Sequence, residues 1–560
     1  MEPTKSDANE PDRGSSAARL PLWACVLLVL ALSATRLIHL GADTPADFVR
    51  ASYGIYVDEG YKTTAARNRV LFGSSRWNPA DDSQDWSEIS PLTTVLFEAA
   101  FRRLGVEIRS VRAVTVVWFG ALLLAAALAL RDRYGGPLLC ALLCAMTFEA
   151  QMVAFSRTAL LVVPLMLFAT LPQLVLARKR FRGLLSFGAV AATCLVVATI
   201  GVKIQAPAYA VGALVAFGLW WWFKDRRDRR LGLALVALGV AGGAIVAYSA
   251  RELISYRIIS SPWDLRLATL NSMHLPSAFA LAATFLAAGH LVLTDRTIFR
   301  DAYVCALLGT IVIGPFAIGL FSYDPVRYYA PLFPTFLLLL AEWASREPWK
   351  KELSVPHWSL GFGAALLLAQ GVLSLLQGLN LQLLERLPLN LGRDPGLADE
   401  SALLAFGTAA LLVGFLAVRR LTWTGAWLPR LVVASLVGTL LVSAYFASRV
   451  FLFPSYASTE LAQRLEELVE PEATVGGDWA PFLFLGTDRR ALHMSDYLNE
   501  LERLGELDLD YYVHSDTELV GQPLWERLQT EDLGVELSEP LLVGSYVGRE
   551  VRLHRLEYVD

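Results

Sequence analysis

Long apolar runs separated by short polar segments are the main feature of the chain. A helix that crosses a bilayer needs about 20 mostly apolar residues. Thirteen runs fit this length: 21–40, 111–130, 137–155, 158–177, 183–202, 207–223, 231–249, 276–294, 302–321, 328–345, 358–378, 401–418 and 428–448. The pattern predicts an α-helical polytopic membrane domain over residues 20–450.

Three segments differ from this pattern. Residues 41–110 form a long loop with amphipathic stretches at 61–72 and 91–104, which predict helices lying in the membrane interface. Residues 455–560 have the pattern of a soluble α/β domain, with a helix near 459–469, strands near Val475 and at 510–513, and a terminal hairpin at 541–556. Residues 1–19 are polar and predict a disordered cytoplasmic tail.

The distribution of Lys and Arg predicts the orientation of the spans. With the N-terminus in the cytoplasm, the inner loops carry clusters of cations, such as 178–182 and 224–230. The short outer loops carry mostly single cations, such as Arg157, Lys203 and Arg327. Cytoplasmic loops are the more basic ones in membrane proteins. We therefore expect a multi-pass plasma (inner) membrane protein whose long loop and C-terminal domain are extracytoplasmic.

Composition excludes some classes of function. The chain is 55% hydrophobic and 18% charged, whereas soluble domains have about 25% charged residues. A net charge of -4 gives no basic field for nucleic acid. The five Cys lie in apolar runs and the seven His are scattered, so no disulfide or metal site is expected.

Ionisable residues gather at the predicted outer ends of the spans. Such residues cost free energy at a membrane boundary unless they are paired or functional. They are Asp58, Glu59, Glu88, Glu149, Arg157, Lys203, Arg251, Glu252, Asp324 and Arg327. If the bundle brings these ends together, carboxylates and cations share one level. This arrangement suits a reaction on a lipid-borne phosphate ester, in which a carboxylate takes a proton and cations hold the phosphate.

Several short motifs occur in order along residues 20–350. They are Asp58-Glu59-Gly60-Tyr61, Ala65-Ala66-Arg67-Asn68, Ser90-Pro91-Leu92, Ser156-Arg157, Lys203 with Pro207, and Arg327-Tyr328-Tyr329-Ala330-Pro331. Together they resemble the GT-C glycosyltransferases, in particular the branch of protein O-mannosyltransferases and aminoarabinose (lipid A) transferases. The aminoarabinose transferases carry a Lys just before the Pro-Pro-Leu of this loop, whereas this chain has Glu88-Ile89-Ser90 there, which argues against a lipid A acceptor.

The resemblance implies an inverting glycosyltransferase that moves a sugar from a polyprenyl-phosphate donor to a hydroxyl acceptor of a protein, lipid or glycan. Asp58 would be the general base, and Glu59 would orient the acceptor or tune Asp58. The other implied site residues are Arg327, Lys203, Arg157, Tyr328, Tyr61 and Arg67 for the donor phosphate and lipid-linked sugar, and Glu88 and Glu149 for the acceptor or sugar. No cofactor is expected, because the cations can replace a divalent metal.

Other interpretations of these residues remain open. Asp58 and Glu59 could cap a helix that starts near Tyr61. Arg327 and Lys203 could snorkel to the interface, and Arg157 could pair with Glu149. The alternative functions are a transporter or flippase and a non-catalytic subunit of cell-envelope assembly. Transporters tend to show internal repeats and polar residues at mid-membrane depth, and this chain shows neither clearly.

Overall fold

The computed structural model describes most of the chain. The described residues are 19–45, 55–82, 90–178, 184–203, 206–224, 232–234, 236–237, 241, 277–319, 326–347, 349, 358–379, 427–494, 499, 501–515, 522–531, 534–546 and 549–558. The expected tail 1–19 and the spans 231–249 and 401–418 fall wholly or mostly outside them. Glu88, Arg251, Glu252 and Asp324 also lie outside the described residues.

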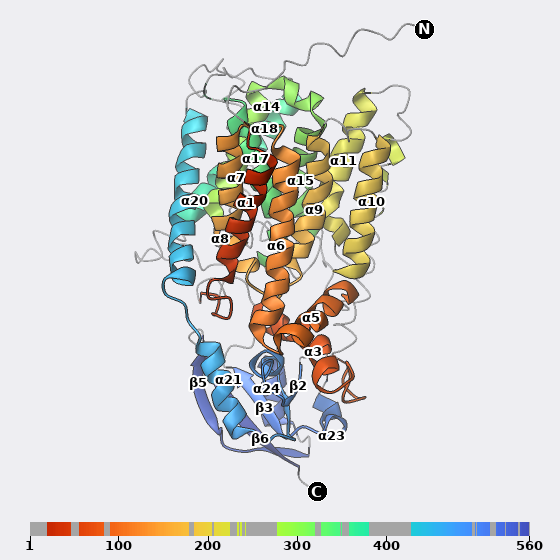
Figure 1. Ribbon diagram of the computed structural model, residues 1–560, viewed down its shortest axis with the longest axis vertical. Coiled ribbons are helices and arrows are strands. Elements are labelled where there is room, and N and C mark those ends of the chain that lie inside the picture. Colours follow the sequence, from red (N-terminus) through yellow and green to blue (C-terminus); the bar gives the residue numbers. More distant parts are fainter. Residues whose placement is uncertain are drawn as a thin grey trace.

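Apolar helices form an elongated bundle (Figure 1). They are α1 (Leu22–Ala34), α6 (Ile108–Leu130), α7 (Gly136–Phe148), α8 (Ala150–Phe155), α9 (Val162–Ala177), α10 (Leu184–Gly201), α11 (Ala206–Lys224), α14 (Ala278–Thr294), α15 (Ala302–Gly319), α17 (Phe333–Ser345), α18 (Trp358–Leu379) and α20 (Trp427–Phe451). Short helical turns join some of them, namely η1 (Thr35–Leu37), η4 (Arg296–Arg300), α16 (Val326–Tyr329) and η5 (Ala330–Leu332). Among the described residues, α6, α11 and α20 are long and apolar enough to cross a membrane.

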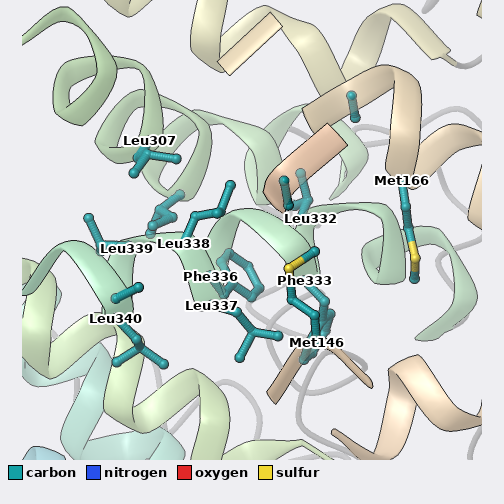
Figure 2. Packing of buried hydrophobic residues seen from close by; sticks show 14 of the residues in the cluster. Met146, Met166, Leu307, Leu332, Phe333, Phe336, Leu337, Leu338, Leu339 and Leu340 are labelled. Atoms are coloured by element: carbon teal, nitrogen blue, oxygen red, sulfur yellow. The ribbon is translucent and has the colours of Figure 1, made fainter. Parts of the chain in front are cut away.

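Close helix packing holds the bundle together. Helices α11 and α15 touch backbone to backbone, because a Cβ on Gly212 would lie 2.5 Å from the carbonyl oxygen of Gly309. Small residues at helix crossings allow this approach inside membranes. Helix α17 lies in the middle of the apolar core, where Phe333 and Phe336 lie near Met146 of α7 (Figure 2). The buried interior therefore follows from the apolar runs of the sequence.

A charged network ties the helix ends together at the end of the bundle far from the C-terminal sheet. Glu342 of α17 accepts hydrogen bonds from Arg133 at 2.8 Å and from Arg346 at 2.7 Å. Arg133 also donates to Asp301 at 2.6 Å, and Arg346 donates to Asp295 at 2.8 Å. Asp295, Glu342 and Arg346 are buried, and each finds an opposite charge, which offsets the cost of removing it from water.

Two elements differ from their predicted bounds. The expected span 137–155 is interrupted at Glu149, whose extended backbone ends α7 and whose side chain accepts a hydrogen bond from the Met152 amide to cap α8. The helix expected from Tyr61 instead begins at Ile55, as α3 (Ile55–Leu71). Asp58 and Glu59 therefore lie inside a helix rather than before one. The helix expected at 91–104 is found with those bounds, as α5 (Pro91–Leu104).

Residues after α20 form a mixed sheet that carries short helices. Its strands are β1 (Thr474–Gly476), β2 (Arg490–Leu492), β3 (Tyr511–Ser515), β4 (Val535–Leu537), β5 (Leu542–Tyr546) and β6 (Arg549–Tyr558). The helices are α21 (Ala457–Leu468), α22 (Ala480–Leu483), α23 (Leu504–Leu507) and α24 (Gln522–Thr530), with the turn η8 (Leu501–Arg503).

The strand order is β2-β1-β3-β6-β4, with β5 paired to the other part of β6. Strand β1 pairs in parallel with β2 and β3, and β6 is antiparallel to its neighbours, with Val513 opposite Leu553. The helix and strands expected from 459–469, Val475, 510–513 and 541–556 are all present. Helices α3 and α5 lie between the bundle and this sheet (Figure 1).

Candidate functional site

A small cavity lies where α3 meets the bundle. Its lining residues are Asp58 and Lys62 of α3, Leu160, Leu161, Val162 and Leu165 around the start of α9, Lys203, Tyr209 of α11, and Arg327 and Tyr328 of α16. Its volume is about 20 Å³, which is enough for about one water molecule. A sugar phosphate is larger, so its binding requires the lining side chains to move.

Asp58 and Arg327 form an ion pair in this cavity. The Nε of Arg327 lies 2.9 Å from Oδ2 of Asp58, and the two side chains are 6% and 26% exposed. The sequence places Asp58 in the first turn of α3, whereas Arg327 lies on a one-turn helix before α17. The structure thus brings Asp58, Lys203 and Arg327 together, as the sequence predicts, and their roles in a reaction remain predictions.

Lys203 and Tyr328 complete the basic side of the cavity. The Nζ of Lys203 lies 4.1 Å from the centre of the Tyr328 ring, and the Cζ of Arg327 lies 5.7 Å from it. An aromatic face attracts cations, so Tyr328 holds both in place. Burial lowers the pKa of Lys203 to about 8, while the Asp58 charge raises it and the Arg327 charge lowers it. An anion in the cavity would favour the charged form of this lysine.

Lys62 lines the same cavity and was missed by the sequence analysis. It follows Asp58 by one helical turn, so both residues lie on one face of α3. This signal was available in the sequence, but only once the helix is known to begin before Asp58. A helix that starts at Tyr61 places Lys62 in its first turn and leaves Asp58 outside.

Glu59 anchors α3 in the protein and does not line the cavity. Its carboxylate is fully buried and accepts two hydrogen bonds from Arg112, at 2.8 and 2.7 Å. It also accepts a hydrogen bond from the Ala159 amide at 2.6 Å. Arg112 in turn donates to the carbonyls of Leu40 and Ala42. Glu59 is therefore placed to position its neighbour Asp58, whereas an acceptor cannot reach it without breaking this ion pair.

Arg67 holds the C-terminal sheet against α3. Its guanidinium donates to the carbonyls of Leu485 at 3.1 Å, Thr487 at 2.9 Å and Arg489 at 2.5 Å. It is buried and is not part of the cavity lining. Its donors are directed at the loop before β2, and its assignment to the donor phosphate stays a prediction.

Tyr61 and Gly60 also lie in the contact between α3 and the C-terminal residues 455–560. The Tyr61 ring packs on the ring of His493, with 5.0 Å between their centres, and it is not part of the cavity lining. A Cβ on Gly60 would lie 2.4 Å from the amide nitrogen of Phe482 in α22. The helix that carries Asp58 is thus packed directly against the C-terminal sheet, and Tyr61 is better described as a packing residue than as a donor ligand.

Two other predicted site residues lie elsewhere. Arg157 donates to the carbonyls of Arg36, Ile38 and His39. Its guanidinium thus fastens the end of α1, and it does not pair with Glu149. The Glu149 carboxylate is buried, caps α8 and accepts a hydrogen bond from Ser277. Neither residue is part of the cavity lining, and their assignments to phosphate and to acceptor or sugar stay predictions.

A second, apolar cavity lies beside the first. It is lined by Leu165, Phe168, Ala169 and Pro172 of α9, Ala191, Cys194, Leu195 and Ala198 of α10, and Ala206 and Ala210 of α11. Leu165 lines both cavities. The two cavities are therefore neighbours with one lining residue in common. Among the described residues, no group of three His, Cys, Asp or Glu side chains could hold a metal ion.

Comparisons with known proteins identify similar structures. The chain is similar to ArnT from Cupriavidus metallidurans in the apo state, with a TM-score of 0.47 and 14% identity. It is also similar to the same protein bound to undecaprenyl phosphate, with a TM-score of 0.48 and 14% identity. Each match covers 94% of this chain and 97% of the other chain. ArnT is a GT-C aminoarabinose transferase. No family model matches the sequence, and no curated protein matches it.

Proposed function

We propose that the protein is an inverting glycosyltransferase that moves a sugar from a polyprenyl-phosphate donor to a hydroxyl acceptor at the outer face of the plasma membrane. The observation that supports this most is the cavity in which the Asp58 carboxylate adjoins Lys203 and Arg327. A carboxylate can take a proton, and a guanidinium and an ammonium can hold a phosphate. The order of the motifs along the sequence, which resembles that of the GT-C glycosyltransferases, supports the class of reaction.

In the proposed reaction, the acceptor oxygen attacks the anomeric carbon and forms the new glycosidic bond. The bond from that carbon to the phosphate oxygen breaks, and its electron pair stays with the polyprenyl phosphate. Asp58 takes the hydroxyl proton of the acceptor. Arg327 and Lys203 stabilise the charge that grows on the departing phosphate. These groups act without a divalent metal in this proposal.

The ion pair between Arg327 and Asp58 supports an order of events in this proposal. A donor phosphate competes for the same guanidinium, since Arg binds phosphate oxygens through a planar fork. Its arrival therefore frees the Asp58 carboxylate to act as a base. In this proposal the first part of the polyprenyl chain lies between α9, α10 and α11, where an apolar cavity of about 10 Å³ has to widen to admit it.

The proposal includes a membrane topology of thirteen spans with a cytoplasmic N-terminus. Helices α3 and α5 lie in the outer interface, and the sheet of residues 455–560 is extracytoplasmic. The excess of Lys and Arg in the inner loops supports this orientation. The acceptor is a hydroxyl group on a protein, a lipid or a glycan.

The decisive experiment uses the purified full-length chain in lipid nanodiscs with synthetic polyprenyl-phosphate sugars. Asp58→Asn should abolish sugar transfer to an added hydroxyl acceptor while donor binding persists. The same reactions with EDTA test whether a metal is needed. If the wild-type chain neither binds nor consumes any polyprenyl-phosphate sugar but moves lipids between leaflets, the protein is a transporter. If deletion of the C-terminal sheet alone causes loss of function in cells, a scaffold explains it better.

A further inference from the structure

Lys62 lines the same cavity as Asp58, and none of the described carboxylates forms an ion pair with it. It packs over its neighbour Tyr61, with its Nζ 4.4 Å from the centre of that ring. Among the residues that the structure describes, no carboxylate lies within ion-pair distance of Lys62 or of Lys203. Both lysines nevertheless line the enclosed cavity with Arg327.

The charges around the cavity do not balance. Of the described residues that line it, Lys62, Lys203 and Arg327 are cations and Asp58 is the one carboxylate. The described lining residues therefore carry two positive charges in excess. Uncompensated charges away from water are costly, so this arrangement favours an anion that carries two negative charges.

The proposed reaction produces such an anion. A polyprenyl-phosphate sugar is a phosphodiester with one negative charge. When the bond to the sugar breaks, the phosphate keeps the bonding electrons and becomes a monoester with close to two negative charges at neutral pH. An interaction that is stronger with the second charge accelerates the reaction, because only differential binding lowers the barrier.

We propose that Lys62 is a further phosphate-binding residue, whose charge matches the second negative charge that the phosphate gains during transfer. This inference rests on the proposed function and adds a residue that neither the motifs nor the ion pair assign. Lys62 is well placed for it, since it lies one helical turn after Asp58 on the same face of α3 and lines the same cavity.

The pKa of Lys62 and the charges that shift it agree with this role. Burial lowers the pKa of Lys62 to about 8, Asp58 raises it, and Lys203 and Arg327 lower it further. A phosphate between these cations would remove their mutual repulsion. Lys62 thus becomes fully charged when the cavity is occupied.

The test measures the affinity of the chain for three lipids with the same polyprenyl chain and headgroups of different charge. They are polyprenyl monophosphate, its methyl phosphodiester and the neutral polyprenol, each titrated into the full-length chain in nanodiscs and followed by native mass spectrometry. Lys62→Met should weaken monophosphate binding by about tenfold or more, which is the usual range for a charged hydrogen bond. The affinity for the phosphodiester should fall less, and the affinity for polyprenol should not change. Lys62→Arg should stay within a few-fold of the wild type.

The controls separate this inference from the proposed function. Lys224→Met makes the same change on an exposed lysine at the end of α11, and it should leave all three affinities unchanged. If the wild-type chain does not bind the monophosphate, the proposed function falls and this inference falls with it. If the wild type binds and Lys62→Met binds the monophosphate equally well, only the role of Lys62 is overturned. Lys62→Gln keeps a polar side chain and decides the matter if the Met variant does not reach the membrane.

Discussion

Asp58 of α3 and Arg327 of α16 hold each other at 2.9 Å, although most of the helical bundle separates them in the sequence. The residue proposed to take a proton is thus engaged by the residue proposed to bind the phosphate. While this ion pair is formed, neither side chain is available for its proposed role, because each is bound to the other. Occupation of the cavity by a phosphate changes both at once.

Replacement of Arg327 tests this relationship. Arg327→Met removes the guanidinium and should lower kcat at least about 100-fold, which is the usual loss for one group that stabilises a developing anion. Arg327→Lys keeps the charge without the planar fork and should recover part of that loss. Steady-state transfer assays measure both variants. Arg102→Met on the exposed side of α5 serves as the control, and a kcat for Arg327→Met within threefold of wild type would refute the role.

The buried pair of Glu59 and Arg112 should contribute to stability through the placement of α3. Each single change, Glu59→Gln or Arg112→Met, leaves a charge buried without its partner and should cost about 3–5 kcal/mol. The double variant Glu59→Leu/Arg112→Met leaves no charge behind, so it should cost less than the sum. Reversible unfolding in mixed micelles gives the three free energies of unfolding. Additive losses would mean that the two groups do not interact.

Gly60 should tolerate no side chain. An added Cβ would lie 2.4 Å from a backbone atom of Phe482, and backbone cannot move aside as a flexible side chain does. Gly60→Ala should therefore cost about 1–3 kcal/mol and loosen the sheet from α3. Hydrogen exchange of residues 480–489 should speed up. Gly41→Ala is the matched control, because no atom lies within 4 Å of its added Cβ, and equal exchange in both variants would contradict the contact.

Binding of a phosphate should weaken as the pH rises from 7 to 9. Lys203 and Lys62 each have a pKa near 8 in the empty cavity, lowered mainly by burial from the usual 10.5. Both are therefore mostly protonated at pH 7 and mostly neutral at pH 9. The phosphate monoester is already almost fully dianionic above pH 7, so a loss of binding above that pH comes from the deprotonation of the lysines. Titrations of polyprenyl monophosphate at several pH values measure it, and a flat profile would show that neither lysine binds the anion.

Hydropathy and motif order predicted much of the fold and the centre of the site. The apolar runs gave most of the described helices, and α5 has its predicted bounds. The acidic pair after the first span indicated the position of Asp58, and the end-of-span cations indicated Lys203 and Arg327. These predictions succeed because burial in a bilayer imposes a strong constraint on local sequence.

Predictions that depended on distant partners were less successful. Helix α3 begins before its predicted start and includes Glu59, which pairs with Arg112, a partner that local sequence does not reveal. Arg67 was assigned to the donor since it belongs to a motif, yet its partners are carbonyls near residue 487. The break at Glu149 is hidden by the apolar residues on both sides of it. Strands β2 and β4 are three residues each, which is too short for an alternating pattern to be recognised.

The contact between Arg67 and the loop before β2 has a consequence for biosynthesis. The ribosome makes Arg67 early and the three carbonyls that receive it more than four hundred residues later. Until that late segment has been translated and has crossed to the same side of the membrane, the guanidinium of Arg67 lacks its acceptors. The nascent chain can thus insert most of its helices while the segment that holds α3 in place is still missing, and the packing around α3 is completed last.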